Sequence, residues 1–317
     1  VSGAKNNRYC NLLTAFYTAM KDKFCNPYYM YKAAAIICGG LFIGLLFFGI
    51  ELIGQAQQVT LEILTCLLTS LINAVFSAMF TRFSWNNRMA RKLWNLKDSS
   101  NCAICVSAHQ WEQVLADGRE RKRSSVSEGQ IIALPHVLSS LHKAYGDSFP
   151  WTNLYNSHTP QAAAAFANDN DLILIGGAVT NPQTGAVFKL VKERVDIKYT
   201  HEWLKVEVHH GQDRGTYCYD IEKKGTIDDG IFEVTKDYAI ILHVTVRGAV
   251  RNRKIVVLAG CTTLGTGGAG QFFCSRMVDN EKWQKNGDKD YVAILSCPYV
   301  NQRPDMENTR VEEFINI

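Results

Sequence analysis

The sequence has little net charge and no dense framework of cysteines. Its 34 basic residues against 30 acidic ones leave a formal charge of +4 at pH 7, which argues only weakly for a nucleic-acid partner. The 10 cysteines are scattered along the chain, which argues against a disulfide-stapled fold and favours reduced thiols in a cytoplasmic domain. Cys102 and Cys105 have CxxC spacing, but without a second such pair we interpret it as coincidence and predict no zinc site.

The sequence also lacks the short motifs of common catalytic centres. It contains no GxSxG nucleophile elbow, no Walker lysine motif and no HExxH metal motif. Adjacent histidines on a strand point to opposite faces, so the neighbouring pair in the β-rich part is not expected to share a metal. We predict no catalytic residue and no metal site, and interpret the isolated candidates as structural or exposed. They are His201, His209, His210, Asp169, Asp171 and Glu193.

Two long apolar runs lie near the start of the chain. The first, Ala33–Ile50, has 18 residues without a charge, and as a helix it would extend about 27 Å, close to the hydrocarbon thickness of a bilayer. The second, Ile63–Thr81, is similar in length. A cleaved signal peptide is a poor alternative, because two runs occur and the first begins only after about thirty residues. We predict a two-helix transmembrane hairpin over residues 32–82.

Basic residues flank this hairpin on one side only. The connecting loop, Glu51–Glu62, has two acidic residues and no basic one. Because lysine and arginine near a membrane end are retained in the cytoplasm, we predict that the loop is external and both termini are cytoplasmic. The basic residues that set this orientation are Lys21, Lys23, Lys32, Arg82, Arg88, Arg91, Lys92 and Lys97.

The two predicted membrane helices differ in character. The first has Gly40 and Gly44, a small-xxx-small pattern that permits close packing against another helix. The second has a polar stripe, because four polar residues recur at four-residue spacing. Two interpretations remain open: hydrogen bonds within one hairpin, or several copies that line a polar path as a homo-oligomer. The stripe consists of Thr65, Thr69, Asn73 and Ser77.

The segments beside the hairpin are polar or amphipathic. Residues 1–31 repeat apolar side chains at helical intervals, which predicts an amphipathic helix. Residues 83–129 are interpreted as a basic juxtamembrane linker, in which Trp85 and Trp94 belong to an interfacial belt. The linker ends in a predicted exposed loop that is solvated, or contacts anionic lipid or nucleic acid. Its bases are Arg119, Arg121, Lys122 and Arg123.

Residues 130–317 have the pattern of a cytoplasmic α/β domain, Rossmann-like, with a β-rich insertion. Helices are predicted at Ile131–Tyr145 and Pro160–Ala167, and the run from Asp171 to a glycine pair predicts a strand buried on both faces. Asn181 and Pro182 are read as an exposed loop at that strand's carboxyl end. Further strands are predicted at Ala186–Leu190, Trp203–Val208, Thr216–Ile221, Ile231–Val234, Tyr238–Val246 and Asp290–Cys297.

A second buried strand, Lys254–Gly260, runs into a glycine-rich segment that we predict to be a loop before a helix. Strand, glycine-rich loop and helix N-terminus together favour an anion such as the phosphate of a nucleotide. The glycine spacing differs from the standard dinucleotide fingerprint, so a tight turn without a ligand stays open. We expect both glycine-bearing strand ends to meet at one sheet edge. The candidate ligand residues are Gly176, Gly177, Asn181, Thr262, Thr263, Gly265, Thr266, Gly267 and Gly268.

With the hairpin and the segments DLILIGG and VVLAGCTTLGTGGAG, the chain resembles the two-transmembrane effectors of bacterial anti-phage systems, of the retron-associated type. The resemblance implies a toxin of the bacterial inner membrane that a reverse transcriptase and its DNA–RNA product hold inactive. When released, such a toxin permeabilises the membrane. Two rival functions remain: a membrane-anchored enzyme that uses a nucleotide, and a receptor whose cytoplasmic domain binds a nucleotide messenger.

Overall fold

The computed structural model describes most of the chain after residue 83. The described residues are 84–114, 120–200, 205–210, 215–224, 233–301 and 303–317, with four helical positions at 70, 73, 75 and 77. Among these residues, no helix is long and apolar enough to cross a membrane. The predicted segment 1–31, the first apolar run with Gly40 and Gly44, and most of the second run lie outside the described residues.

Part of the predicted polar stripe is described. Asn73 and Ser77 are both helical and exposed, as are Ser70 and Val75 beside them. Thr65 and Thr69 lie outside the described residues. Contacts between residues divide the chain into two units, Val1–Arg88 and Met89–Ile317, and the second unit is a mixed α/β domain.

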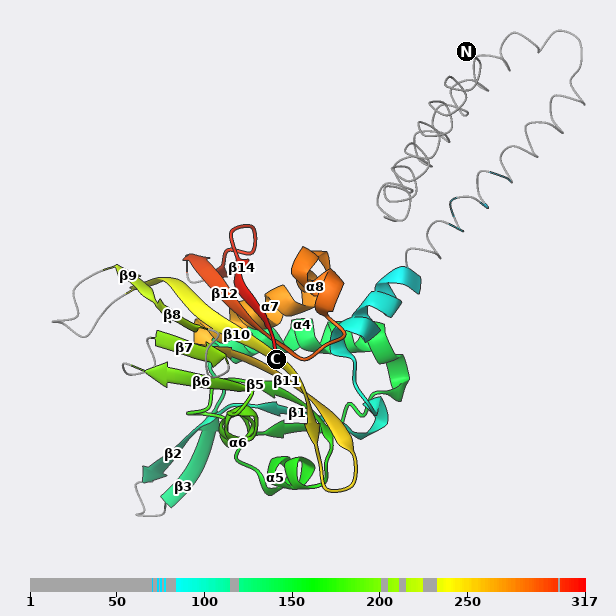
Figure 1. The fold of residues 1–317 in the computed structure, drawn as a ribbon. Coiled ribbons are helices and arrows are strands. Elements are labelled where there is room, and N and C mark those ends of the chain that lie inside the picture. The colour runs from blue at the N-terminus through cyan, green and yellow to red at the C-terminus, as the bar shows by residue number, and fades with distance from the viewer. Residues whose placement is uncertain are drawn as a thin grey trace, which may run out of the picture. The chain divides into compact units, whose positions relative to one another are not determined.

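One nine-stranded sheet forms the centre of this domain (Figure 1). Its strand order is β13-β12-β10-β11-β5-β1-β4, with β14 paired to β12 and β9 paired to β10. Strands β4, β1, β5 and β11 are parallel, and the sheet becomes antiparallel from β10 onward. The strands are β1 (Cys102–Val106), β4 (Leu154–Asn156), β5 (Asp171–Ile175), β9 (Glu222–Lys224), β10 (Glu233–Arg247), β11 (Asn252–Gly260), β12 (Tyr291–Val300), β13 (Arg303–Pro304) and β14 (Arg310–Asn316).

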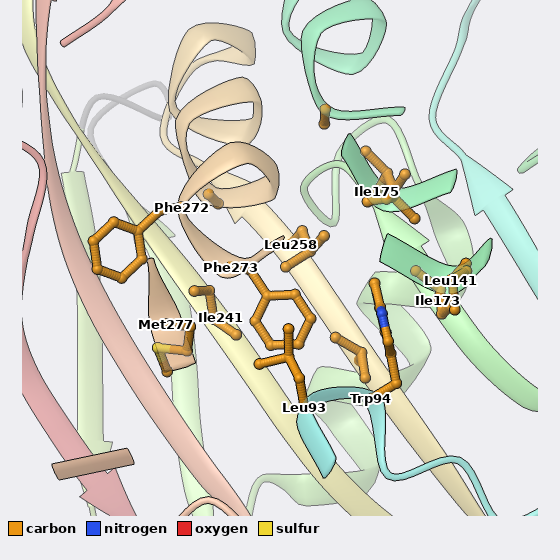
Figure 2. Packing of buried hydrophobic residues seen from close by; sticks show 14 of the residues in the cluster. Leu93, Trp94, Leu141, Ile173, Ile175, Ile241, Leu258, Phe272, Phe273 and Met277 are labelled. Atoms are coloured by element: carbon orange, nitrogen blue, oxygen red, sulfur yellow. The ribbon is translucent and has the colours of Figure 1, made fainter. Parts of the chain in front are cut away.

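Both faces of the sheet are covered, which explains the continuous apolar runs of its central strands. Ile173 and Ile175 of β5 belong to one buried cluster, with Trp94 and Phe273 (Figure 2). Leu172 of the same strand faces the other cluster, on the opposite side of the sheet. The first cluster is covered by the helical residues 89–94, α4 (Glu128–Tyr145), α7 (Thr263–Ser275) and α8 (Glu281–Asn286).

The second face is covered by two helices and a small antiparallel sheet. The helices are α5 (Pro160–Ala167) and α6 (Pro182–Val191), and the sheet has the order β6-β7-β8. Its strands are β6 (Val195–Thr200), β7 (Lys205–His210) and β8 (Thr216–Asp220). Short 3-10 turns complete the domain at Ser99–Asn101, Gly146–Ser148 and Met277–Asp279. Of the predicted β-rich part, β6, β7 and β8 form this separate layer, whereas β9 and β10 belong to the main sheet.

Several predicted elements are confirmed and others need correction. The helices α4 and α5 and the buried strands β5 and β11 occur where the sequence predicted them. The predicted strand Ala186–Leu190 is wrong, because this segment belongs to helix α6, which begins with Asn181 as its N-cap and Pro182 in its first turn. The two strands predicted on either side of residue 236 are one continuous strand, β10.

The prediction of a glycine-rich loop after β11 is also wrong. The glycines lie inside helix α7, where Gly267 and Gly270 allow α4 to approach closely, and Gly265 and Gly268 lie against the main sheet. A Cβ atom on Gly129 of α4 would lie 1.4 Å from the carbonyl oxygen of Thr263, and one on Gly270 would lie 2.5 Å from the Cβ of Ala133. The glycine-rich pattern therefore reflects close packing of α7 against both α4 and the sheet, since side chains at these positions would hold the elements apart.

The segment between the apolar runs and the sheet is part of the domain core. We call residues 89–98 the entry segment. Trp94 is fully buried, and its ring meets Phe273 edge-to-face at 4.9 Å between centroids. The Trp94 Nε1–H donates to Ser140 Oγ at 3.0 Å. Trp94 thus lies in the hydrophobic core and does not belong to an interfacial belt, and part of the predicted linker forms β1, in the middle of the parallel strands.

The basic segment near residue 120 is a hairpin strand and not a loop. The hairpin pairs β2 (His109–Val114) with β3 (Glu120–Ser125) in antiparallel register, and it extends away from the main sheet in Figure 1. Arg121, Lys122 and Arg123 belong to β3, whereas Arg119 lies outside the described residues.

The helix contact leads to a stability prediction. Gly129→Ala should lower the free energy of unfolding by about 3 kcal/mol, because the new methyl group can be accommodated only if α4 moves away from α7. The control is Gly185→Ala in α6, whose Cβ would lie 3.6 Å from its nearest neighbour. That change should be neutral or stabilising by about 1 kcal/mol, since alanine favours a helix over glycine. Urea unfolding of the full chain in detergent measures both, and equal effects would contradict this account.

Candidate functional site

The carboxyl ends of β1, β5 and β11 meet at one edge of the sheet. Ile175 lies opposite Val106 on one side and Leu258 on the other. The Gly176 N–H donates to the carbonyl oxygen of Leu258 at 2.9 Å, and a Cβ on Gly177 would lie 3.8 Å from the carbonyl oxygen of Gly260. The prediction that the two glycine-bearing strand ends lie side by side is confirmed. In open α/β sheets, this edge is where ligands bind.

A carboxylate of the protein itself lies at the N-terminus of α7. Asp237 of β10 accepts hydrogen bonds at Oδ2 from the Thr262 N–H at 3.0 Å, the Thr262 hydroxyl at 2.5 Å and the Gly265 N–H at 2.7 Å. Its Oδ1 accepts from the N–H of Tyr238 at 2.7 Å. First-turn N–H groups of a helix attract anions, so Asp237 occupies the position that the sequence assigned to a phosphate.

Asp237 is fully buried, and its four donors are all uncharged. Burial raises the pKa of this carboxyl above its ordinary value, and the hydrogen bonds from Thr262, Gly265 and Tyr238 only partly oppose that shift. Thr262 is also the N-cap of α7, since its hydroxyl oxygen accepts from the Leu264 N–H at 3.2 Å. One carboxylate and one hydroxyl therefore satisfy several donors that a helix start leaves without partners.

The end of β5 requires glycine for two reasons. Gly176 has φ +119°, and a Cβ there would lie 2.1 Å from Ser107 Oγ, which follows β1. Ser107 Oγ in turn accepts from Gln130 Nε2 at 2.6 Å, and Gln130 contacts Ser127, the N-cap of α4. A buried hydrogen-bond chain thus joins the ends of two strands to the start of α4.

Asn181 is buried and bonded within the protein, so the prediction of an exposed loop is wrong. Its Oδ1 accepts from the Thr184 N–H at 3.3 Å, and its Nδ2 donates to the carbonyl oxygen of Cys105 at 3.2 Å. The Thr184 hydroxyl donates to the carbonyl oxygen of Gly176 at 3.0 Å. These bonds tie the start of α6 to the ends of β1 and β5.

The structure brings most of the predicted ligand residues to this edge, but internal contacts engage them. Thr266 Oγ1 accepts from the Gly260 N–H at 3.0 Å. Gly267 packs toward α4, and a Cβ on Gly268 would lie 2.8 Å from Cys297 Sγ. Sequence reasoning missed Asp237, Ser107 and Gln130. Asp237 lies 25 residues before Thr262 in the chain, and only the sheet topology brings the two together.

The isolated histidines and acids have mainly structural contacts. His209 Nδ1 lies 2.9 Å from Thr216 Oγ1 on the neighbouring strand, and His201 lies outside the described residues. Asp171 accepts from the N–H groups of Asp98 and Lys254, both at 2.7 Å. Among the described residues, no three His, Cys, Asp or Glu side chains are grouped in a way that would hold a metal ion.

Comparisons of this chain with protein-family models, with curated proteins and with solved structures found no match. Function must therefore be argued from the residues and their geometry. At the sheet edge, hydrogen-bond donors that a ligand would use are bonded to side chains of the protein itself. We call this arrangement the sealed network.

The sealed network leads to a prediction for Asp237. Asp237→Asn should lower the free energy of unfolding by about 3 kcal/mol. Both carboxylate oxygens accept hydrogen bonds, so in either orientation the NH2 group of asparagine would face an N–H donor of the protein. Asp147→Asn, at an exposed residue, is the control and should change stability by less than about 0.5 kcal/mol. Urea unfolding measures both, and a neutral Asp237→Asn would show that the carboxylate does not hold α7 in place.

Proposed function

We propose that the chain is a membrane effector of bacterial anti-phage defence. Its N-terminal segment permeabilises the inner membrane as an oligomer, and its α/β domain holds that segment inactive while a partner is bound. The partner would be a reverse transcriptase with its DNA–RNA product. The polar stripe on the second of two uncharged runs is the observation that carries the proposal, because lipid is a poor solvent for an amide such as that of Asn73.

The stripe gives this proposal its mechanism. Four polar side chains at four-residue spacing share one face of a helix, and Asn73 and Ser77 are helical. One two-helix hairpin cannot enclose a water-filled path, so a polar path requires several copies. The first run, with Gly40 and Gly44, is suited to the close helix packing that such an assembly needs.

The geometry of the α/β domain favours regulation over catalysis. The donors at the α7 N-terminus are satisfied by Asp237, and Ser107, Gln130 and Asn181 are all engaged with the protein itself. A catalytic centre needs reactive groups that face a substrate, whereas a regulatory domain needs a stable scaffold and a contact surface. The β2–β3 hairpin carries Arg121, Lys122 and Arg123, bases of the type that contacts phosphates of nucleic acid or lipid.

The alternative is a nucleotide-messenger receptor or a nucleotide-using enzyme. The convergence of β1, β5 and β11 at one edge, with glycines at their ends, favours it. Asp237 opposes it, because an anionic ligand at α7 would have to displace a carboxylate that already has four hydrogen bonds. If ATP or a cyclic dinucleotide raises the thermal unfolding temperature of the full chain, the result would support the nucleotide-binding alternative.

Membrane depolarisation tests the proposal. Wild-type chain expressed in bacteria without its partner should collapse the membrane potential, as reported by a voltage-sensitive dye. Asn73→Leu should abolish this effect, because it removes the amide from the polar stripe. Val75→Leu, an apolar exchange two residues away on the same helix, should leave it intact. Cells that die with an intact potential would exclude permeabilisation, and a fully active Asn73→Leu would exclude the stripe as its cause.

A further inference from the structure

A buried polar chain connects the entry segment to the sheet, at the opposite edge from Asp237. His243 Nε2 lies 3.2 Å from the carbonyl oxygen of Trp94, and His243 Nδ1 lies 3.5 Å from Lys254 Nζ. Lys254 Nζ lies 3.1 Å from Asp290 Oδ1. An ammonium group only donates, so Nδ1 accepts, and the proton on Nε2 is donated to Trp94. We call Asp290, Lys254 and His243 the relay.

The end of the helix at 84–94 explains why this contact is needed. Asn95 has φ +46°, and its N–H donates to the carbonyl oxygen of Arg91 at 2.8 Å, which ends the helix. The carbonyl of Trp94, the last residue of the helix, then has no helical partner and lies in the core. A buried carbonyl without a donor is costly. His243 supplies the donor.

His243 and Lys254 of the relay are buried and Asp290 is half-buried, and His243 is neutral. His243 is fully buried and Lys254 is 1% exposed. Burial and the neighbouring Lys254 charge lower the pKa of His243 to about 3, against a weaker opposing effect of Asp290. The imidazole therefore keeps one proton, and its orientation is fixed, over the whole neutral range. The contact with Trp94 does not depend on physiological pH.

Asp290 joins the relay to three other parts of the domain. Its carboxylate accepts from Arg194 Nη2 at 2.6 Å and from the N–H of Thr245 at 2.8 Å. Arg194 lies just before β6, and the same Nη2 donates to the main-chain oxygen of Ile317 at 3.1 Å. A change in the position of β6, β10 or the end of β14 would thus reach Lys254 directly.

The relay pairs the buried ammonium group of Lys254 with the half-buried carboxylate of Asp290. A protein in which apolar residues of similar volume replace a buried ion pair is often as stable as the original or more so. Loss of only one partner of the pair is strongly destabilising. Such a network therefore tends to be either complete or broken, and intermediate states are unfavourable. A network that is either complete or broken is suited to a contact that switches between two states, and simple packing does not need one.

We propose that the relay is a latch through which the α/β domain holds the entry segment, and that breaking the latch releases residues 89–98 from the core. The consequence for activity rests on the proposed function: release of the segment is the step that frees the membrane-active runs. The latch itself rests only on the geometry of the domain.

Hydrogen exchange on the full chain in detergent micelles tests the latch. The amides of Asn95, Leu96 and Asp98 are hydrogen-bonded and report on the entry segment. His243→Phe keeps an aromatic ring beside Tyr291, which stacks on His243 at 5.0 Å, but removes both hydrogen bonds. We expect these amides to exchange about tenfold faster, with little change in β5. His243→Gln, which can donate to Trp94, should restore most of the protection.

The matched control is Val244→Ala, at the next residue of β10. Val244 is fully buried but faces the other cluster, away from the entry segment. It should lower overall stability without selective exchange in residues 89–98. If His243→Phe affects the entry segment and β5 equally, or leaves both unchanged, the latch is refuted. If His243→Phe does not fold, Asp290→Asn takes its place. We expect a smaller selective increase in exchange at the same amides, and the same outcomes would refute the latch.

Depolarisation in cells separates the latch from the proposed function. If both hold, His243→Phe should depolarise bacteria at a severalfold lower expression level than wild type, and Val244→Ala should not. If wild type never depolarises the membrane, the proposed function fails, while the exchange data still decide the latch. If exchange is selective but depolarisation begins at the wild-type level, the latch exists and does not control activity, which refutes that part of the proposal.

Discussion

The close approach of α4 to α7 is the constraint on which the rest of the domain depends. Gly129 lets the backbone of α4 touch that of Thr263, and this contact fixes where α7 begins above the sheet. The start of α7 then meets Asp237, whose carboxylate satisfies the N–H groups of Thr262 and Gly265. The start of α4 meets Ser107 through Gln130. A larger side chain at the crossing would therefore disturb the packing and the polar edge together.

Strand β10 connects the two polar networks of the domain. Asp237 near its start lies at the carboxyl edge of β11, whereas His243 near its end lies beside Lys254 at the opposite edge. Ala239 and Ile241 between them belong to the same buried cluster as Trp94. A shift of β10 along its own axis would disturb both polar networks at once. This gives a physical route from the sheet edge to the entry segment, and it needs no flexible linker.

The sequence predicted elements whose signals are local. The run DLILIGG and the apolar part of β11 were identified as buried strands because both faces of a parallel sheet are covered. Helix α6 was missed, although Asn181 and Pro182 form a common helix start. The glycines of α7 were misread because glycine favours a loop unless a neighbouring helix lies close, and that neighbour, Gly129, is distant in sequence. The site residue Asp237 was missed for the same reason.

Two carboxylates of this domain, the buried Asp237 and the half-buried Asp290, show how neighbouring groups set the pKa of a carboxyl. Burial raises the pKa of Asp237, and its four neutral donors do not reverse that shift. Burial would raise the pKa of Asp290 as well, but hydrogen bonds from Arg194 and Thr245 and the charge of Lys254 lower it below the ordinary value. Asp290 is therefore held as an anion by Arg194 and Lys254 together. Loss of the Asp290 carboxylate would leave the buried Lys254 ammonium without this anion. The N–H groups that bond to Asp237 Oδ2 come from the start of α7, so this environment follows the helix crossing, whereas Asp290 holds its own neighbours in position.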